Sequence, residues 1–208
     1  MQNGSLAVQG GRDIVPTINE FLSLPFALRI ATKDWHPQDH ISFASNHPPP
    51  DNKPFETIIT IHNPLNPEET QETRLWPDHC VQGSSGAELL PELQQSEIKY
   101  IVEKGQDKRV EMYSAFRDPF LNPTVSRSTL AEKLRSANIT DVYVVGLAAD
   151  YCVRYTALHS VQEGFETWVV PEATRPVDPA SLPEVYQEYE TAGIKLVTKD
   201  EVKERVTS

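Results

Sequence analysis

The chain has 208 residues and a mass of 23.4 kDa, which is enough for one domain with a sizeable core and too few for two. With 38% hydrophobic and 24% charged residues and a mean hydropathy of -0.44, it has the composition of a soluble globular protein rather than a disordered one. The net charge of -11, with no basic cluster, argues against nucleic acid as a partner. We therefore expect a single domain over residues 1–208.

Features that would direct the chain to a membrane or out of the cell are not found in the sequence. No apolar run approaches the roughly 18 residues of a membrane helix, so we expect no membrane partner. The first residues, MQNGS, lack the basic and apolar character of a signal peptide. The two cysteines, Cys80 and Cys152, are too few for a disulfide framework and are typical of thiols in a reducing compartment. These observations predict a cytoplasmic protein.

Apolar, β-branched runs alternate with segments of helical character along the chain. In order, the pattern predicts helix 13–23, strand 26–32, strand 58–62, helix 86–95, strand 97–103, helix 128–137, strand 141–148, helix 149–163, strand 165–171, helix 179–192 and strand 195–198. Ser126 and Ser128 are candidate N-caps, and Gly164 and Gly193 stand where helices should end. This alternation predicts an α/β fold with a mainly parallel sheet and helices on both faces.

One long region departs from the alternation. Residues 35–85 are rich in proline, histidine and asparagine and contain only one predicted strand. The histidines of this region are His36, His40, His47, His62 and His79. A loop region of this length in a compact domain is usually functional or disordered, and the histidines favour a function.

Asp34 and His36 directly follow the predicted strand 26–32. Ligands of open α/β sheets bind beyond the carboxyl ends of the strands, and residues two apart in extended backbone point to the same side. A carboxylate and an imidazole are ligands that zinc prefers, and His79 on a second loop could supply a third. The spacing is common by chance, however, and on spacing alone a turn-capping Asp34 with a solvated His36 is the better explanation.

Cys152 and Lys104 are two further candidates for chemistry. Cys152 lies where the predicted strand 141–148 gives way to a helix, and the positive end of the helix dipole should ease ionisation of its thiol. Lys104 ends the predicted strand 97–103, where its ammonium could stabilise a thiolate or an oxyanion. A packed helical cysteine and an exposed lysine are the alternatives, and Cys80 is interpreted as structural. A nucleophile, a cation and three metal-type ligands at one sheet edge together predict an enzyme.

The candidate residues lie in four stretches: KDWHPQDHISFASNH (33–47), LWPDHCVQGSSGAEL (75–89), VEKGQDKRVEMYSAF (102–116) and VVGLAADYCVRYTAL (144–158). These stretches resemble the nicotinamidases, which are amidohydrolases of the isochorismatase-like cysteine hydrolase family. The resemblance extends over nearly the whole chain from Gly4 and implies a three-layer α/β/α fold around a six-stranded, mostly parallel sheet. It also implies hydrolysis of a small molecule, nicotinamide, to nicotinate and ammonia in NAD salvage.

The resemblance assigns roles to the residues around the thiol. Cys152 matches the nucleophile that forms a thioester, and Lys104 matches the cation that favours its thiolate. The peptide bond between Leu147 and Ala148 matches a non-proline cis bond that aims the Ala148 N–H into an oxyanion hole.

The resemblance also assigns a metal site and a substrate pocket. Asp34, His36 and His79 match metal ligands, which implies one divalent metal as cofactor, with zinc ahead of other metals. Trp76 and Tyr113 match residues that line the pocket for the substrate ring. The D-W-H and D-H-C motifs favour the nicotinamide-hydrolysing branch, because the isochorismatase branch lacks this metal site.

At the amino end this chain differs from the family. Nicotinamidases begin with a central strand that ends in Asp-Met-Gln-Asn-Asp-Phe shortly before Gly-Ser-Leu, whereas here Met1-Gln2-Asn3 leads straight to Gly4-Ser5-Leu6. We therefore expect the strand and its general-base aspartate to be missing, and Asp13 matches no family position. Two alternatives stay open: another isochorismatase-like cysteine hydrolase, or an inactive truncated form that binds a metal or metabolite. A homo-oligomer also stays open.

Overall fold

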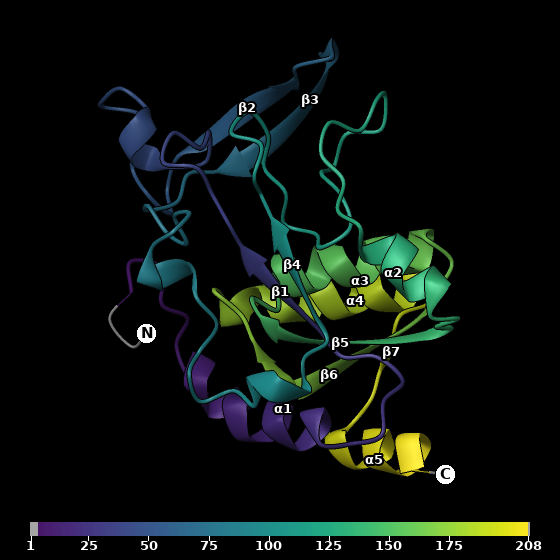
Figure 1. Ribbon diagram of the computed structural model, residues 1–208. Helices are drawn as coiled ribbons and strands as arrows, with labels where there is room; N and C mark the ends of the chain where they lie inside the picture. The colour runs from purple at the N-terminus through teal and green to yellow at the C-terminus, as the bar shows by residue number, and fades with distance from the viewer. Residues whose placement is uncertain (1–3, 208) are drawn as a thin grey trace.

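The computed structural model describes residues 4–207, in which helices and strands alternate along the chain (Figure 1). Met1-Gln2-Asn3, on which the expectation of a missing strand depends, lie outside the described residues. In chain order the elements are α1 (Val15–Leu22), β1 (Ile30–Asp34), β2 (Ile58–Asn63), β3 (Asn66–Arg74), β4 (Tyr100–Lys104), α2 (Leu130–Ser136), β5 (Asp141–Leu147), α3 (Cys152–Gln162), β6 (Glu166–Arg175), α4 (Leu182–Ala192), β7 (Lys195–Leu196) and α5 (Lys199–Thr207).

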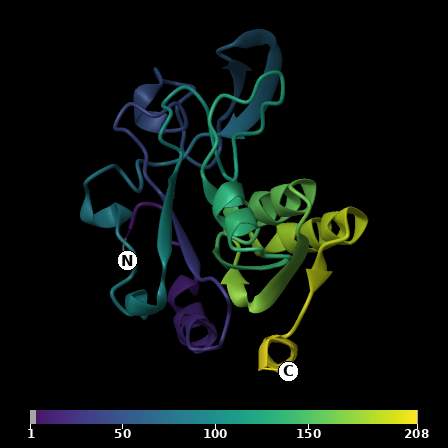
Figure 2. The ribbon, with the colours of Figure 1, turned by 45° about the vertical axis from the view of Figure 1, so that its right-hand side comes forward.

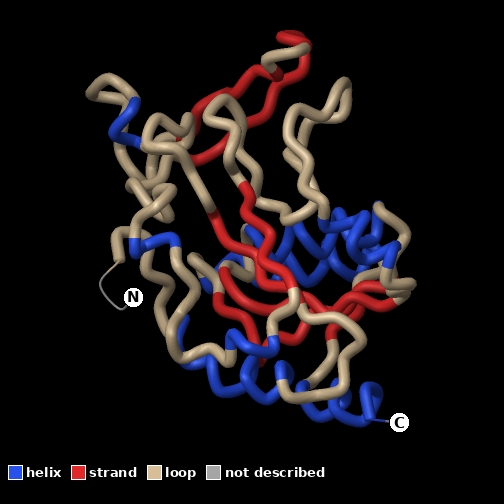
Figure 3. Tube along the Cα trace, in the orientation of Figure 1, coloured by secondary structure: helices blue, strands red, loops and turns tan. Residues whose placement is uncertain are grey.

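The parallel strands form two groups. β1 pairs with β4, and β5, β6 and β7 form a second sheet in that order, with every pairing parallel. Both groups lie at the centre of the molecule in Figure 3, while the antiparallel β2–β3 hairpin projects at the top of Figure 1. The predicted parallel α/β architecture is confirmed, but its strands form two separate groups, because β1 and β5 do not pair with each other.

Helices cover both faces of the β5–β6–β7 sheet. Val144 and Val169 pack against α3 and α4 on one face, while Trp168 and Val170 pack against α1 and α5 on the other. This follows from the strand geometry, because successive side chains along β6 point to opposite faces. In Figures 1 and 2, α1 and α5 lie together below the strands, and α2, α3 and α4 lie on the opposite side. The three-layer α/β/α arrangement implied by the resemblance is thus confirmed.

Local signals in the sequence account for several helix ends. The predicted N-caps Ser126 and Ser128 are wrong for α2, because Thr129 is its N-cap, although the Ser128 side chain accepts a hydrogen bond from the Leu130 N–H just outside that position. Gly193 ends α4 in the left-handed conformation, which glycine adopts without the clash of a side chain. Among residues 4–207, every helix is too short or too polar to span a lipid bilayer.

The predicted helix over residues 86–95 is wrong. Only isolated 3-10 turns form there, at Ser85–Ala87 and Gln95–Glu97. Pro91 lies inside the segment and cannot donate to a helical hydrogen bond. Instead the side chain of Asn19 bonds the backbone of Glu92 and Gln94, so α1 satisfies groups that a helix would have satisfied internally.

Other boundaries differ as well. β1 begins at Ile30, so the first part of the predicted strand 26–32 is irregular, and β6 continues to Arg175 instead of ending at residue 171. β3 and α5 were not predicted. β3 is strongly polar and becomes a strand by pairing with β2, and α5 has few apolar residues, of which Val202 is buried.

Candidate active site

Asp34 and Lys104 end two adjacent strands at the same edge of the sheet. They are direct partners in the parallel register of β1 and β4, and their side chains form an ion pair. The Lys104 ammonium is buried, donates to the Met112 carbonyl oxygen at 3.2 Å, and lies 3.4 Å from the Cys152 Sγ. Cys152 is the first residue of α3, shortly after β5 ends. Three chain segments therefore bring a thiol, an ammonium and a carboxylate together.

Burial and neighbouring charges set the protonation of these groups. Burial acts to lower the pKa of Lys104, but the facing carboxylate of Asp34 raises that pKa above its usual value. Burial acts to raise the pKa of Asp34, but Lys104 holds it well below its usual range, so the pair is ionised at neutral pH.

The thiol of Cys152 behaves differently from the prediction. Burial raises its pKa to about 11, because the loss of hydration outweighs the attraction of Lys104, and the negative charge of Asp34 raises it further. The expectation that the helix start eases ionisation is therefore wrong for this state of the protein. Burial raises the pKa of Cys80 still higher, to about 12.

Asp34, His36 and His79 form a cluster suited to a metal ion. Each offers one ligand atom, and these atoms all lie within 4.8 Å of one another. The Nδ1 of His36 bonds the Gly105 carbonyl oxygen at 2.8 Å, and the Nδ1 of His79 bonds the Pro77 carbonyl oxygen at 2.8 Å. Because a carbonyl oxygen only accepts, both Nδ1 atoms carry a hydrogen, so in the neutral tautomer of each ring the lone pair that can bind a metal is on Nε2. Metal-binding histidines typically have this arrangement, so the donor set fits zinc or a similar divalent metal.

The two loops that carry these ligands are tied to each other. The His36 N–H donates to the Cys80 carbonyl oxygen, and the Gln82 N–H donates back to the His36 carbonyl oxygen. Behind them the buried ring of His40 lies 4.2 Å from that of His36, and its Nδ1 bonds the Ser42 hydroxyl at 2.8 Å. Burial lowers the pKa of His40 to about 4, so this ring is neutral at pH 7. It supports His36 by packing.

Aromatic side chains lie beside the thiol. The Trp76 Nε1 donates to the Tyr113 hydroxyl at 2.9 Å, and burial raises the pKa of Tyr113 well above its usual value, which keeps that hydroxyl neutral. The ring of Tyr151, which directly precedes Cys152, lies 4.9 Å from the Trp76 ring and 5.2 Å from the Tyr113 ring. These rings offer flat apolar surfaces for a planar substrate.

The connection from β5 to α3 has an irregular backbone. The peptide bond between Leu147 and Ala148 is cis, and the Ala148 carbonyl oxygen accepts from the N–H groups of Tyr151 and Val153 at 3.1 and 3.0 Å. These bonds fix the turn in which Cys152 begins its helix.

Comparison with known proteins identifies the family. The isochorismatase domain family matches residues 41–201. The chain belongs to the isochorismatase family. A nicotinamidase of Acinetobacter baylyi is 37% identical to this isochorismatase-family hydrolase over 196 residues, which cover 94% of this chain and 85% of the relative. A nicotinamidase of Saccharomyces cerevisiae is 34% identical over 205 residues, with 94% and 92% covered.

Solved structures agree with this family. The yeast nicotinamidase bound to the inhibitor nicotinaldehyde matches with a TM-score of 0.87 at 33% identity, covering 94% of this chain and 92% of that one. The pyrazinamidase of Pyrococcus horikoshii in complex with zinc matches with a TM-score of 0.70 at 32% identity, covering 95% and 92%.

Two residues of this site were not singled out from the sequence. Tyr151 completes the aromatic wall, and its position directly before Cys152 was the available signal. Gly105 accepts the hydrogen bond of His36, and its place directly after Lys104 gave only a weak indication. Of the other histidines of the 35–85 region, His47 bonds the Ile41 carbonyl oxygen and His62 of β2 bonds the Pro67 carbonyl oxygen of β3, and neither is part of the cluster.

Proposed function

We propose that this isochorismatase-family hydrolase converts nicotinamide to nicotinate and ammonia through a thioester on Cys152. The observation that carries the proposal is the contact of Cys152 with Lys104, whose partner Asp34 belongs to the cluster with His36 and His79. Nicotinamidases that are 34% and 37% identical over most of the chain support the substrate.

Each residue around the thiol has one task in the reaction. The Cys152 sulfur attacks the carboxamide carbon, and the ammonium of Lys104 stabilises the thiolate and the charge that develops on the substrate. The N–H groups of Ala148 and Cys152 receive the oxyanion. The proton of the Cys152 thiol passes to the amide nitrogen, the C–N bond breaks and ammonia leaves. Water then adds to the thioester carbon, the C–S bond breaks, and nicotinate and the free thiol are released.

The metal cluster and the aromatic wall orient the substrate. Asp34, His36 and His79 hold one divalent metal, for which zinc is the first choice, because their oxygen and nitrogen donors suit it. When bound, the metal supplies a Lewis acid for the pyridine nitrogen. Trp76 and Tyr113 line the pocket that receives the ring of the substrate.

A second candidate function follows because the reaction needs a proton acceptor for the Cys152 thiol, and the carboxylates near that thiol already have other partners. General acid–base groups contribute about 10²–10⁴-fold to such reactions. Among residues 4–207, the carboxylates whose charge acts most on Cys152 are those of Asp34 and Glu111. Asp34 is ion-paired with Lys104, and Glu111 accepts the Met112 N–H at 2.8 Å. Together with the high pKa of Cys152, this favours a form that binds a metal or metabolite without catalysis.

Ammonia release from nicotinamide, with and without a chelator, tests both functions. An amidase loses all activity in Cys152→Ser, keeps it in the control Cys80→Ser, and shows a higher KM after chelation. Metal binding without ammonia release by the unmodified chain would instead support the binding protein. Ammonia release by Cys152→Ser at the rate of the unmodified chain would contradict the proposed nucleophile.

A cellular role accompanies this proposal. Hydrolysis of nicotinamide places the protein in NAD salvage, and the two free cysteines support a cytoplasmic location.

A further inference from the structure

Hydrogen bonds join the rings beside the thiol to the projecting β2–β3 hairpin. The Trp76 Nε1 donates to the Tyr113 hydroxyl at 2.9 Å, and this hydroxyl lies 2.9 Å from the Thr73 Oγ1. Thr73 belongs to β3, and its side chain is buried. A strand that lies outside the parallel sheet therefore contacts two of the rings of the aromatic wall, which consists of Trp76, Tyr113 and Tyr151.

The direction of the two hydrogen bonds follows from the groups that form them. An indole N–H can only donate, so the Tyr113 oxygen accepts from Trp76. Burial raises the pKa of Tyr113 well above its usual value, so the hydroxyl keeps its own hydrogen. Among residues 4–207, Thr73 is its other hydrogen-bond partner, and the Tyr113 hydroxyl therefore donates to the Thr73 Oγ1. If Thr73 donated instead, the hydrogen of Tyr113 would be left unpaired, which is unfavourable at a buried site.

Ring contacts alone define the position of these side chains less closely. The Tyr113 ring stacks on the Tyr155 ring with centroids 5.5 Å apart, and the Trp76 ring meets the Phe55 ring edge-on at 5.8 Å. Aromatic contacts allow centroid distances of about 4.5–7 Å, whereas a hydrogen bond holds its donor and acceptor about 2.7–3.2 Å apart. The two hydrogen bonds therefore fix the positions of the Trp76 and Tyr113 rings more closely than their packing does.

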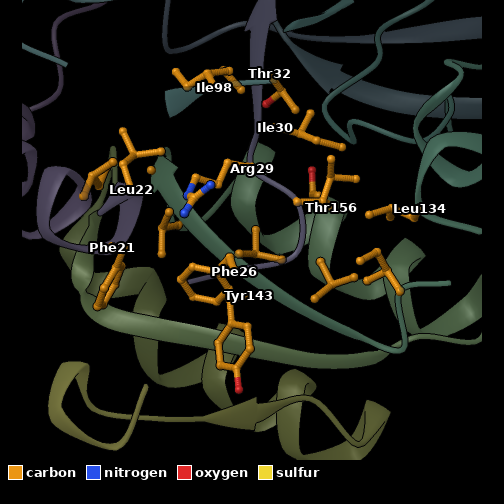
Figure 4. A pocket seen from close by; sticks show the side chains of 18 of the residues that line it. Phe21, Leu22, Phe26, Arg29, Ile30, Thr32, Ile98, Leu134, Tyr143 and Thr156 are labelled. Carbon is orange, nitrogen blue, oxygen red and sulfur yellow. The ribbon is translucent and has the colours of Figure 1, made fainter. Parts of the chain in front are cut away.

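The aromatic wall is separate from the large apolar cavity on the other side of the thiol. This cavity has a volume of about 810 Å³ and is lined mainly by α1, β1 and β5, with Cys152 at its border. Figure 4 shows the side chains around it. Trp76, Tyr113 and Tyr151 are not among the described residues that line it. The rings of the wall therefore depend on contacts of their own.

We propose that Thr73 is a positioning residue for the aromatic wall. Its hydroxyl holds the Tyr113 hydroxyl, which in turn holds the Trp76 indole in the plane that receives the substrate ring. The bonds of Lys104 to Met112, Cys152 and Asp34 do not involve Thr73. Loss of the Thr73 hydroxyl should thus weaken binding of the ring and leave the chemistry at the thiol unchanged. That the ring belongs to nicotinamide rests on the function proposed above, whereas the positioning of Trp76 does not.

The test compares variants of the full chain at two buried strand threonines. Thr73→Val removes the hydroxyl and nearly keeps the shape of the side chain, and Thr73→Ser keeps the hydroxyl. Thr167→Val is the matched control, because Thr167 is a buried residue of β6 whose hydroxyl donates to the Ser160 hydroxyl at 2.8 Å. Thr73→Ala, which also lacks the hydroxyl, takes the place of Thr73→Val if the valine variant does not fold.

Fluorine NMR of protein labelled with 5-fluorotryptophan reports the position of Trp76 directly. The chain has three tryptophans, and the signal that disappears in Trp76→Phe is that of Trp76. Thr73→Val should shift and broaden this signal, while Thr73→Ser and Thr167→Val should leave it in place. Unchanged signals of Trp35 and Trp168 in Thr73→Val would show that the fold is intact. An unchanged Trp76 signal in a folded variant without the Thr73 hydroxyl would overturn the proposal.

A double variant tests whether Thr73 acts through the Tyr113 hydroxyl. Tyr113→Phe removes the hydroxyl between Thr73 and Trp76, and it should shift the Trp76 signal by itself. In that background Thr73→Val should change the signal no further, because the link is already broken. A second shift as large as that in the unmodified chain would show that Thr73 acts on Trp76 by another route, and it would overturn the proposal.

Affinity for nicotinamide is the second measurement. It is made by calorimetry on zinc-loaded Cys152→Ser, in which the proposed nucleophile is absent. Added to this variant, Thr73→Val should raise the dissociation constant about threefold to tenfold, which is the usual effect of one lost hydrogen bond. Thr73→Ser and Thr167→Val should change it less than about twofold. In the chain with Cys152, Thr73→Val should raise KM by the same factor and leave kcat unchanged.

The two measurements distinguish failure of this proposal from failure of the proposed function. An equal loss of affinity in Thr167→Val, or a lower kcat with an unchanged KM in Thr73→Val, would overturn the positioning role. If nicotinamide does not bind when Thr73 is intact, the proposed function fails, and the fluorine signal of Trp76 still decides whether Thr73 positions the wall.

Discussion

Replacement of Gly105 by alanine should damage the metal site through a single added methyl group. Gly105 has a φ of +68°, and a Cβ built on it would lie 2.6 Å from the Nδ1 of His36. The same glycine provides the carbonyl oxygen that fixes the His36 ring. The alanine therefore cannot fit unless His36 moves away from Asp34 and His79.

Two effects of different size combine in this variant. The left-handed backbone costs a non-glycine residue about 1–2 kcal/mol, which should lower the free energy of unfolding. Displacement of His36 and weakening of its hydrogen bond should lower the affinity for a divalent metal by about 10–100-fold, the usual effect of losing such a partner.

The measurement is zinc affinity by competition with a fluorescent chelator, together with urea unfolding of the metal-free protein. Gly193→Ala is the matched control, because Gly193 has a φ of +79° and open space where its Cβ would lie. Both variants should lose stability, Gly105→Ala the more because its methyl group also displaces His36, and only Gly105→Ala should lose zinc affinity. Equal zinc affinity of the two variants would refute the assignment of His36 as a ligand held by Gly105.

Two further predictions concern stability. Lys104→Met leaves the carboxylate of Asp34 without its buried partner and should lower the free energy of unfolding by about 3 kcal/mol in urea, whereas Lys108→Met breaks an exposed ion pair and should leave it unchanged. Burial lowers the pKa of His159 from 6.5 to about 4, so the unfolded chain binds more protons between these values and stability falls as the pH drops through this window. At pH 4 this amounts to about 3 kcal/mol, from 1.36 kcal/mol per pKa unit, and it should disappear from the pH profile of His159→Gln but not from that of the exposed-site control His62→Gln. Identical pH profiles for these two variants would contradict the buried, neutral state of His159.

Much of the site could be predicted from sequence because its residues stand at the ends of regular elements. Asp34 ends β1, Lys104 ends β4 and Cys152 begins α3, so the rule that carboxyl ends of parallel strands meet at one edge was sufficient to group them. The apolar alternation likewise indicated β5 and α4, whose side chains form the core. These features depend on residues close in sequence, where periodicity carries the information.

Elements with few apolar residues could not be predicted from sequence, because their structure depends on contacts with neighbouring elements. The polar strand β3 exists because β2 supplies its hydrogen-bond partners. α5 packs against the sheet through Val202 and through Arg205, which lies 4.0 Å from the ring of Trp168. Residues 86–95 do not form the predicted helix, because Pro91 interrupts the segment and the side chain of Asn19 in α1 bonds the backbone of Glu92 and Gln94.

The electrostatics of the site were decided only by the tertiary structure. The position of Cys152 at the start of a helix predicted an easily ionised thiol, but burial and the charge of Asp34 raise the pKa of this thiol to about 11. Desolvation and distances between groups far apart in the chain have no signature in local sequence.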